Sequence, residues 1–198
     1  MSRNSLPYQE ALAAAIMTIE DLIAKKSTPV VIIDGRAGAG KSRFAADLLE
    51  AYFRLETRLP KTIHMDDLYP GWQGLRAGSL YLNQTILNHV AAGREAHWQV
   101  WDWSNDERGN PCETSNGWRS FEGGNLLLVE GCGALSLHSA EIADLSIWID
   151  SDLETRRKRF SDRDQGQFDE HWHPWTIQED QFYEAEKSRE LSDLRVKN

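Results

Sequence analysis

The sequence predicts an α/β fold, a three-layer α/β/α sandwich with a mainly parallel central sheet and a short helical lid. Short apolar runs rich in β-branched residues alternate with longer segments whose apolar residues recur at helical spacing. That alternation is typical of a parallel sheet covered by helices on both faces. A glycine-rich stretch, residues 35–42, joins the first apolar run to the helical segment that follows it. Together these observations favour one domain over residues 1–198.

The first half of the chain begins with a helix expected over residues 8–26, because Leu12, Ile16, Ile19 and Ile23 fall on one helical face. Pro29–Asp34 is apolar and β-branched, which indicates a buried strand. The further elements expected in this half are a helix over 41–57, a strand over 61–65, a loop over 68–74 and a helix over 79–92 that Gly93 ends.

The second half is expected to add three strands and two helices. Residues 97–103 alternate like a strand, and 104–124 are rich in Gly and Asn, which predicts a long loop or a hairpin excursion. The remaining expected elements are buried strands at 125–130 and 145–150, a helix over 152–164, an irregular stretch to Pro174 and a helix over 175–194. The lid region is expected at about 152–174.

The composition restricts the partners and the compartment. The formal net charge is −9 and the isoelectric point is about 5.2, which argues against a nucleic-acid polymer or an anionic membrane as the main partner. No stretch approaches the ~20 apolar residues of a membrane span. Cys112 and Cys132 form no metal pattern and no disulfide framework, which predicts unpaired thiols in a cytoplasmic protein. Self-association as a homo-oligomer stays open.

The glycine-rich stretch matches G-x-x-x-x-G-K-[ST], the phosphate-binding P-loop, which predicts a P-loop NTPase fold. Glycines let the backbone wrap around phosphates with several N–H groups pointing inward, and the helix that follows adds partial positive charge. Lys41 is expected to reach the β- and γ-phosphates, and Ser42 to ligate Mg²⁺. The motif therefore predicts ATP and Mg²⁺ as cofactors, bound by Gly35, Arg36, Ala37, Gly38, Ala39, Gly40, Lys41 and Ser42.

Three acids follow or end the predicted strands: Asp66, Asp67 and Glu130. Ligands of open parallel sheets bind at the carboxyl ends of strands, so these acids are expected to face the P-loop. One can hold the metal, directly or through water, and one can accept a proton from an attacking hydroxyl. The alternative is that they only cap turns.

Basic side chains crowd one short segment of this otherwise acidic chain. On a helix Arg156, Arg159 and Arg163 share one face and could stabilise charge on a transferring γ-phosphate. The alternative is a solvated basic helix paired with its own acidic neighbours, which fits Arg157 and Lys158 better. Trp101 and Trp103 alternate with Asp102, so both could face one side of a sheet and stack on a planar substrate, or belong to the core.

Several motifs, in order and spacing from about residue 29 to 165, resemble the uridine kinase and phosphoribulokinase-like branch of P-loop kinases. They are Gly35–Ser42, Met65-Asp66-Asp67-Leu68-Tyr69, Val100-Trp101-Asp102-Trp103, Leu128-Val129-Glu130-Gly131, and Asp150–Arg156 with Arg159 and Arg163-Asp164. Asp-Asp-Leu-Tyr-Pro-Gly-Trp from Asp66 and His-Trp-x-x-Trp from His171 further resemble a bacterial subgroup of uridine kinase-like ATP-binding proteins.

The resemblance implies a role for each matching residue. Asp66 would be the catalytic base near the metal, and Glu130 would bind Mg²⁺ together with Ser42. Trp101 and Trp103 fall on the segment that contacts the base of the nucleoside, and Asp67 and Tyr69 are expected at the same substrate. The lid arginines would be Arg156 toward the nucleotide, and Arg159 and Arg163 in catalysis.

Three departures from uridine kinases lie on substrate contacts or on the lid. The region of the ribose-binding acid is Leu80-Tyr81-Leu82-Asn83, without an acid; Ser104-Asn105-Asp106 lacks the expected histidine; and Gln165–Phe168 replaces a basic stretch. The phosphate and metal motifs are intact. The sequence therefore predicts a kinase that moves the γ-phosphoryl group of ATP to a hydroxyl of a small molecule, most simply a nucleoside or nucleoside-like metabolite. The alternatives are a non-nucleoside acceptor, such as a sugar acid or pantothenate-like compound, and an ATP-binding switch or bare ATPase.

Overall fold

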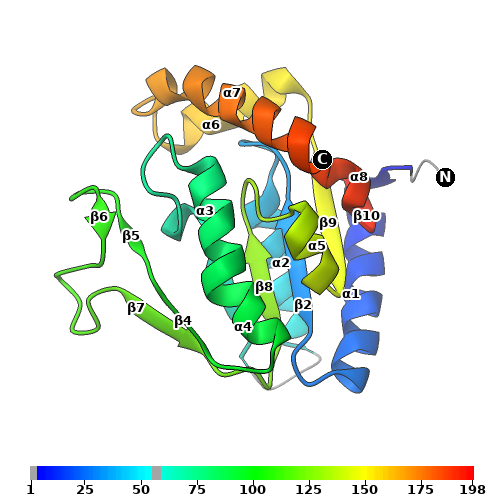
Figure 1. The fold of residues 1–198 in the computed structure, drawn as a ribbon. Coiled ribbons are helices and arrows are strands. Elements are labelled where there is room, and N and C mark those ends of the chain that lie inside the picture. Colours follow the sequence, from blue (N-terminus) through cyan, green and yellow to red (C-terminus); the bar gives the residue numbers. More distant parts are fainter. Residues whose placement is uncertain (1–3, 55–58) are drawn as a thin grey trace.

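The computed structural model describes residues 4–54 and 59–198. At its centre lies a six-stranded sheet in which every neighbouring pair is parallel. This confirms the predicted α/β fold with a mainly parallel sheet (Figure 1). In spatial order the strands are β1 (Leu6–Pro7), β10 (Leu194–Lys197), β9 (Leu145–Asp150), β2 (Val30–Asp34), β8 (Leu127–Glu130) and β3 (Lys61–His64).

Helices cover both faces of this sheet, which gives the three layers seen in Figure 1. Along β2, Val31 and Ile33 point into one core with α1 (Tyr8–Lys25) and α2 (Lys41–Tyr52), whereas Val30 and Ile32 point into the other. Strand residues alternate between faces, so an all-apolar strand must be covered on both sides. The second face carries α3 (Leu75–Tyr81), a π-helical segment (Leu82–Leu87), α4 (Asn88–Ala91), α5 (Leu137–Ile142), α7 (Asp169–Glu186) and α8 (Ser188–Leu191).

A pair of short antiparallel ribbons extends from the side of the molecule (Figure 1). The strand expected over 97–103 is divided at Val100, whose N–H donates to Gly117 O while its C=O accepts from Gly109 N–H. The expected excursion at 104–124 is therefore a hairpin. Its strands are β4 (Ala96–Gln99) with β7 (Trp118–Phe121), and β5 (Trp101–Asp102) with β6 (Glu107–Arg108).

The prediction was wrong at the end of the chain, where the helix expected over 175–194 begins earlier and ends earlier. α7 already starts at Asp169 and includes Pro174, and Lys187, at φ +56°, ends it in the left-handed conformation. The residues that follow form α8 and then β10, which pairs with β9. The apolar residues of β10 are few, so their alternation was too short to distinguish a strand from the end of a helix.

Two smaller boundaries also differ from the prediction. The helical run expected over 79–92 begins at Leu75 and passes through the π-helical segment before it ends at Ala91. The helix expected over 41–57 ends at Tyr52, and residues 55–58 lie outside the described residues. Within 4–54 and 59–198, no helix combines the length and apolar character that crossing a membrane requires.

Glycines let the phosphate loop pack directly against two other backbones. A Cβ on Gly35 would lie 2.5 Å from Ile149 O in β9, and one on Gly38 would lie 2.2 Å from Arg156 O in α6 (Leu153–Arg163). Both distances are shorter than real Cβ contacts, so only glycine fits. The loop is thereby fixed against β9 and against α6, the helix that carries Arg156, Arg159 and Arg163.

Gly131, directly after β8, offers a test of this close packing. It adopts φ +142°, and a Cβ there would lie 2.3 Å from Met65 Cβ, next to Asp66. We expect Gly131→Ala to lower the free energy of unfolding by about 1–3 kcal/mol, because overpacking adds to backbone strain. Gly93→Ala is the control, since Gly93 also has positive φ but no atom would lie within 4 Å of its Cβ. Equal losses in denaturant titrations of the two variants would contradict the packing argument.

Candidate active site

The ends of three neighbouring strands bring the predicted phosphate and acid residues together. The P-loop follows β2, Asp66 and Asp67 follow β3, and Glu130 is the last residue of β8. Most of the P-loop and all three acids line one cavity of about 800 Å³, whereas Gly35, Arg36 and Ala39 do not line it. Its polar part is formed by Ala37, Gly38, Gly40, Lys41, Ser42, Arg43, Asp66, Asp67, Glu130, Arg159 and Arg163, and its apolar part mainly by Tyr69, Trp72, Trp103, Phe160, Phe168 and Trp175.

Lys41 is buried and is the first residue of α2. The N-cap residue of this helix is Gly40, which has φ +99° and no side chain to cap the helix. The first N–H groups of this helix are therefore left for a ligand, and the helix dipole favours an anion there. The Lys41 ammonium donates to Arg36 O at 3.0 Å and to Cys132 Sγ at 3.3 Å. Burial alone would lower its pKa, but Cys132, Glu130 and Asp34 outweigh burial and raise it. Lys41 is thus positively charged at neutral pH.

Ser42 and Glu130 form a pair that fits a magnesium site. Ser42 Oγ donates to the Glu130 carboxylate at 3.2 and 3.3 Å, and His64 Nδ1 lies 2.7 Å from Glu130 Oε1. Burial would raise the pKa of Glu130, but the hydrogen bond from His64 and the charge of Lys41 hold it below its usual value. An ionised carboxylate next to a hydroxyl suits Mg²⁺, which needs few protein ligands when phosphate oxygens and water supply the rest.

Asp66 faces the same cavity from the other side. The Asp66 side chain is 67% exposed to the open cavity, but the protein atoms around it displace part of its hydration, and this desolvation and the charge of Glu130 both raise its pKa. Arg163 Nη1 lies 3.9 Å from its Oδ2, and Trp103 Nε1 donates to its backbone carbonyl at 2.9 Å. A carboxylate with raised pKa beside a phosphate site is a suitable proton acceptor. Asp67 is exposed at the cavity rim, and partial loss of its hydration and the charge of Asp66 raise its pKa.

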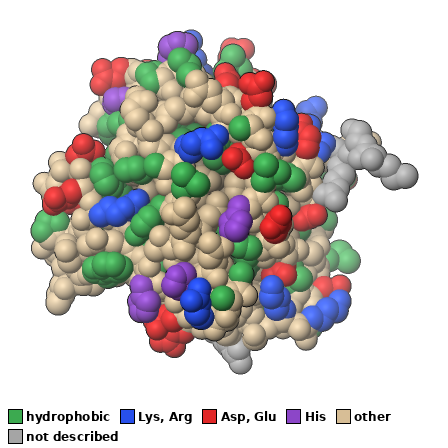
Figure 2. All heavy atoms as spheres, in the orientation of Figure 1, with side chains coloured by type: hydrophobic (Ala, Val, Ile, Leu, Met, Phe, Trp, Pro, Cys, Tyr) green, Lys and Arg blue, Asp and Glu red, His purple; other side chains and the backbone are tan. Residues whose placement is uncertain are grey.

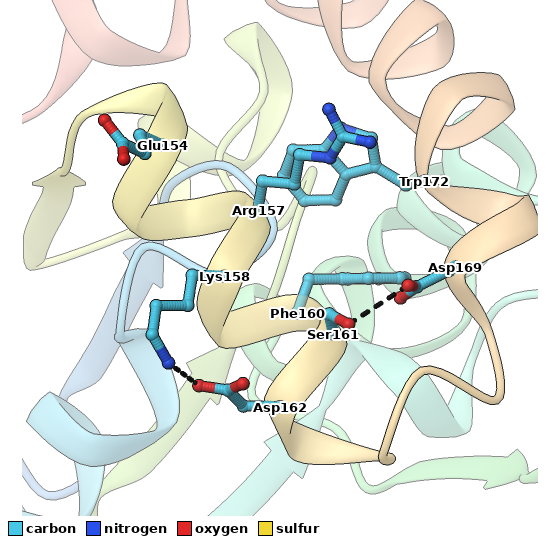
Figure 3. A pocket seen from close by; sticks show the side chains of 8 residues that line it. All are labelled: Glu154, Arg157, Lys158, Phe160, Ser161, Asp162, Asp169 and Trp172. Atoms are coloured by element: carbon cyan, nitrogen blue, oxygen red, sulfur yellow. Dashed lines mark hydrogen bonds and ion pairs between the residues drawn. The ribbon is translucent and has the colours of Figure 1, made fainter.

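The basic residues of α6 separate into three groups. Arg159 and Arg163 line the cavity, and Arg159 Nη1 lies 3.4 Å from Ala39 O. Arg156 does not line it; this side chain is buried behind the loop, with Nη1 3.4 Å from Ala37 O. Arg157 and Lys158 line a second, smaller hollow on the outer side of α6, where Lys158 pairs with Asp162 (Figure 3).

An aromatic cluster forms the apolar wall of the cavity, with Trp72 at its centre. The Trp72 ring lies 5.3 Å from Trp103 and 5.4 Å from Phe168, and stacks on His171 at 4.3 Å. Trp72 precedes α3, whereas Phe168 and His171 belong to the predicted lid segment, so the cluster joins these two parts.

Acidic and basic side chains are scattered together over the face shown in Figure 2.

Two of the predicted substrate residues lie in unexpected surroundings. The Tyr69 ring borders the cavity, but the side chain is buried and its hydroxyl donates to Cys132 O at 2.7 Å. Trp101 does not line the cavity; its ring lies beside the guanidinium of Arg108, at 5.7 Å. The hairpin explains this difference. Trp101 is the first residue of β5, whereas Trp103 follows the end of β5 and so does not share its strand geometry.

Sequence reasoning missed Asp34, the last residue of β2. Its buried carboxylate accepts from the N–H groups of Gly35, Gly133 and Leu135 and from the hydroxyl of Tyr183. Burial raises the pKa of Asp34 to about 6, although these hydrogen bonds oppose the shift. Asp34 thus ties the P-loop to the segment after Glu130 and to α7. An acid that ends a buried strand directly before a glycine was the available signal.

Solved structures with the same fold cover nearly the whole chain. A possible uridine kinase from Bacillus stearothermophilus has a TM-score of 0.65 at 16% identity, covering 95% of this chain and 98% of that chain. A candidate fructose transport system kinase from Silicibacter sp. TM1040 has a TM-score of 0.57 at 16% identity, covering 93% and 98%. The YGR205w protein has a TM-score of 0.52 at 12% identity, covering 94% of each chain.

At these identities the likeness establishes the fold, which is the α/β fold of these kinase-like proteins, and confirms the predicted resemblance at that level. No family model and no curated protein matches the sequence.

Lys41→Ala tests whether the cavity holds nucleotide phosphates. Removing a buried ammonium from a phosphate site is expected to lower ATP turnover by at least about 100-fold, the usual loss when one preorganised charge donor is removed. Isothermal calorimetry with ATP and Mg²⁺ should show weaker binding, and circular dichroism should show an unchanged fold. Lys25→Ala, at an exposed helix end, is the control. Unchanged affinity and turnover in Lys41→Ala would exclude the P-loop interpretation.

Proposed function

We propose that this protein is an ATP-dependent kinase that transfers the γ-phosphoryl group to a hydroxyl of a small molecule. The observation that carries the proposal is one cavity with three features: a phosphate loop, the Ser42 hydroxyl beside the ionised carboxylate of Glu130, and the carboxylate of Asp66 with its raised pKa. A phosphate-binding loop alone would serve an ATPase or a switch equally well. Asp66 favours a kinase, because it offers a proton acceptor next to a space large enough for a second substrate.

The mechanism relies on positioning and on charge. The amide groups of Gly38–Ser42 and the ammonium of Lys41 hold the phosphates, and Arg159 and Arg163 face them from α6. These fixed charges stabilise negative charge on the transferring group, and the bound geometry removes most of the entropic cost of bringing two substrates together. Ser42 and Glu130 would hold Mg²⁺, which would neutralise part of the phosphate charge when bound. Asp66 accepts the proton of the acceptor hydroxyl as its oxygen bonds to the γ-phosphorus, while the bond between that phosphorus and the β–γ bridging oxygen breaks and ADP leaves.

The acceptor in this proposal is a nucleoside or nucleoside-like alcohol, and a sugar acid or pantothenate-like compound is the alternative. Trp72, Trp103 and Phe168 offer flat apolar surfaces that suit a planar ring. A sugar would instead need hydrogen-bonding side chains for its hydroxyl groups. A thermal-shift screen of nucleosides, sugars and vitamins, with Mg²⁺ and a slowly hydrolysed ATP analogue present, would identify the class.

Asp66→Asn separates a kinase from an ATPase or a switch. The substitution keeps the size of the side chain but removes its basicity, so phosphoryl transfer should fall by about 10²–10⁴-fold, the usual contribution of a general base. Nucleotide affinity should change much less. The readout is transfer to the acceptor found in the screen, measured beside calorimetric ATP binding. Asp162→Asn, on the outer side of α6, is the control. Transfer at the wild-type rate in Asp66→Asn would remove the proposed base.

Uridine tests the acceptor site itself. The segment Leu80–Asn83 supplies no acid for ribose hydroxyls, and within the described residues the buried Asn83 donates to Ser136. We therefore expect little or no phosphorylation of uridine at concentrations that saturate an efficient uridine kinase. A coupled assay with a uridine concentration series measures this directly. Efficient turnover with a Michaelis constant in the micromolar range would contradict the expectation.

A further inference from the structure

A buried carboxylate from outside the P-loop contacts the loop backbone. Glu179, in α7, is fully buried, and its Oε1 accepts from the N–H of Ala37 at 2.6 Å and from Cys132 Sγ at 3.4 Å. Glu179 lies 142 positions after Ala37 in the sequence. None of the motifs in the sequence includes Glu179, and it does not line the cavity.

The second oxygen of the same carboxylate lies between two arginines. Glu179 Oε2 is 3.6 Å from Arg36 Nη1 and 3.8 Å from Arg156 Nη1. Arg36 belongs to the P-loop and Arg156 to α6, so one carboxylate connects three separate segments of the chain. A neutral glutamine could still accept from Ala37 N–H. The charge holds the buried Arg156 and the partly exposed Arg36 at one carboxylate, because without it the two guanidinium groups repel each other.

Glu179 and Arg156 bind both backbone polar groups of Ala37, which belong to two consecutive peptide units. The Ala37 N–H donates to Glu179, and its C=O accepts from Arg156 at 3.4 Å. The backbone of Arg156 lies directly against Gly38, where a Cβ would come within 2.2 Å. Arg159 and Arg163 are one and two turns further along α6 on the side of Arg156. The position of Arg156 therefore sets where these two cavity-lining arginines point.

We infer that Glu179 is a positioning residue for the phosphate site. It orients the backbone N–H of Ala37 directly, and through Arg156 it fixes α6 so that Arg159 and Arg163 face the phosphates. This inference rests on the proposed function, since it assigns Glu179 to the same nucleotide site. It makes α7 a structural link between the P-loop and the arginines rather than only a cover for the sheet.

Two substitutions at this position separate the two contacts. Glu179→Gln keeps the acceptor for Ala37 N–H but loses the charge between the arginines, so turnover should fall by about tenfold or more while ATP affinity stays within about threefold. Glu179→Ala loses both contacts, so ATP affinity should also weaken by about tenfold. A merely structural role would lower stability in both variants without this split between affinity and turnover.

The matched control is Asp180→Asn. Asp180 is the next residue in α7 and pairs with Arg36 at 2.6 Å, but it is exposed. An exposed ion pair contributes little, so affinity and turnover should stay within about twofold of wild type.

A substitution of the partner arginine tests the same link from the other side. Arg156→Met should reproduce the turnover loss of Glu179→Gln. The double variant, Glu179→Gln with Arg156→Met, should be no worse than either single variant, because the two side chains act as a unit.

The readouts are calorimetric binding of a non-hydrolysable ATP analogue with Mg²⁺ and the turnover of ATP, both on variants shown to be folded by thermal unfolding. Wild-type affinity and turnover in Glu179→Ala and Glu179→Gln would overturn the inference, as would additive losses in the double variant or an equal loss in Asp180→Asn. If the wild-type protein does not bind the analogue, the proposed function fails and the inference fails with it. Binding by wild type that Glu179→Ala leaves unchanged refutes the inference alone.

Discussion

The close packing of the phosphate loop against β9 and α6 is the constraint on which the rest of the site depends. Gly35 and Gly38 touch the backbones of Ile149 and Arg156 at distances that no side chain allows. Because the loop has no room to move toward either element, its amide groups are held in place before any ligand arrives. Preorganised donors of this kind stabilise developing charge without a further cost of reorganisation. The glycines thus serve the fold and the chemistry together.

Positively charged side chains gather at the cavity although the chain as a whole is acidic. The chain carries a formal net charge of −9, yet Lys41, Arg159 and Arg163 face one cavity. Each acid near them has a different environment. Glu130 is held ionised by His64 and Lys41, whereas partial desolvation in the cavity and the charge of Glu130 raise the pKa of Asp66. Two carboxylates with opposite shifts at one site suit two different tasks, metal binding and proton acceptance.

Local patterns predicted most of the fold, and contacts between distant segments account for what they missed. The central strands were predictable because Val30–Asp34 and Leu145–Asp150 are continuous apolar runs, and the P-loop because its motif is specific. The final strand β10 was missed because a run of four residues has no clear period. Asp34 and Glu179 were missed for another reason. Their hydrogen bonds join segments 99 and 142 residues apart, and spacing along the chain carries no signal of such contacts.

In the proposed function, a nucleoside triphosphate binds in this cavity with its γ-phosphate between Lys41 and Asp66. A crystal structure with Mg²⁺ and a non-hydrolysable ATP analogue tests it most directly. We expect density for the triphosphate against the amide groups of Gly38–Ser42, with the metal at Ser42 and Glu130, and the terminal phosphate facing the aromatic wall. A nucleotide bound elsewhere, or a terminal phosphate directed away from Asp66, would contradict it.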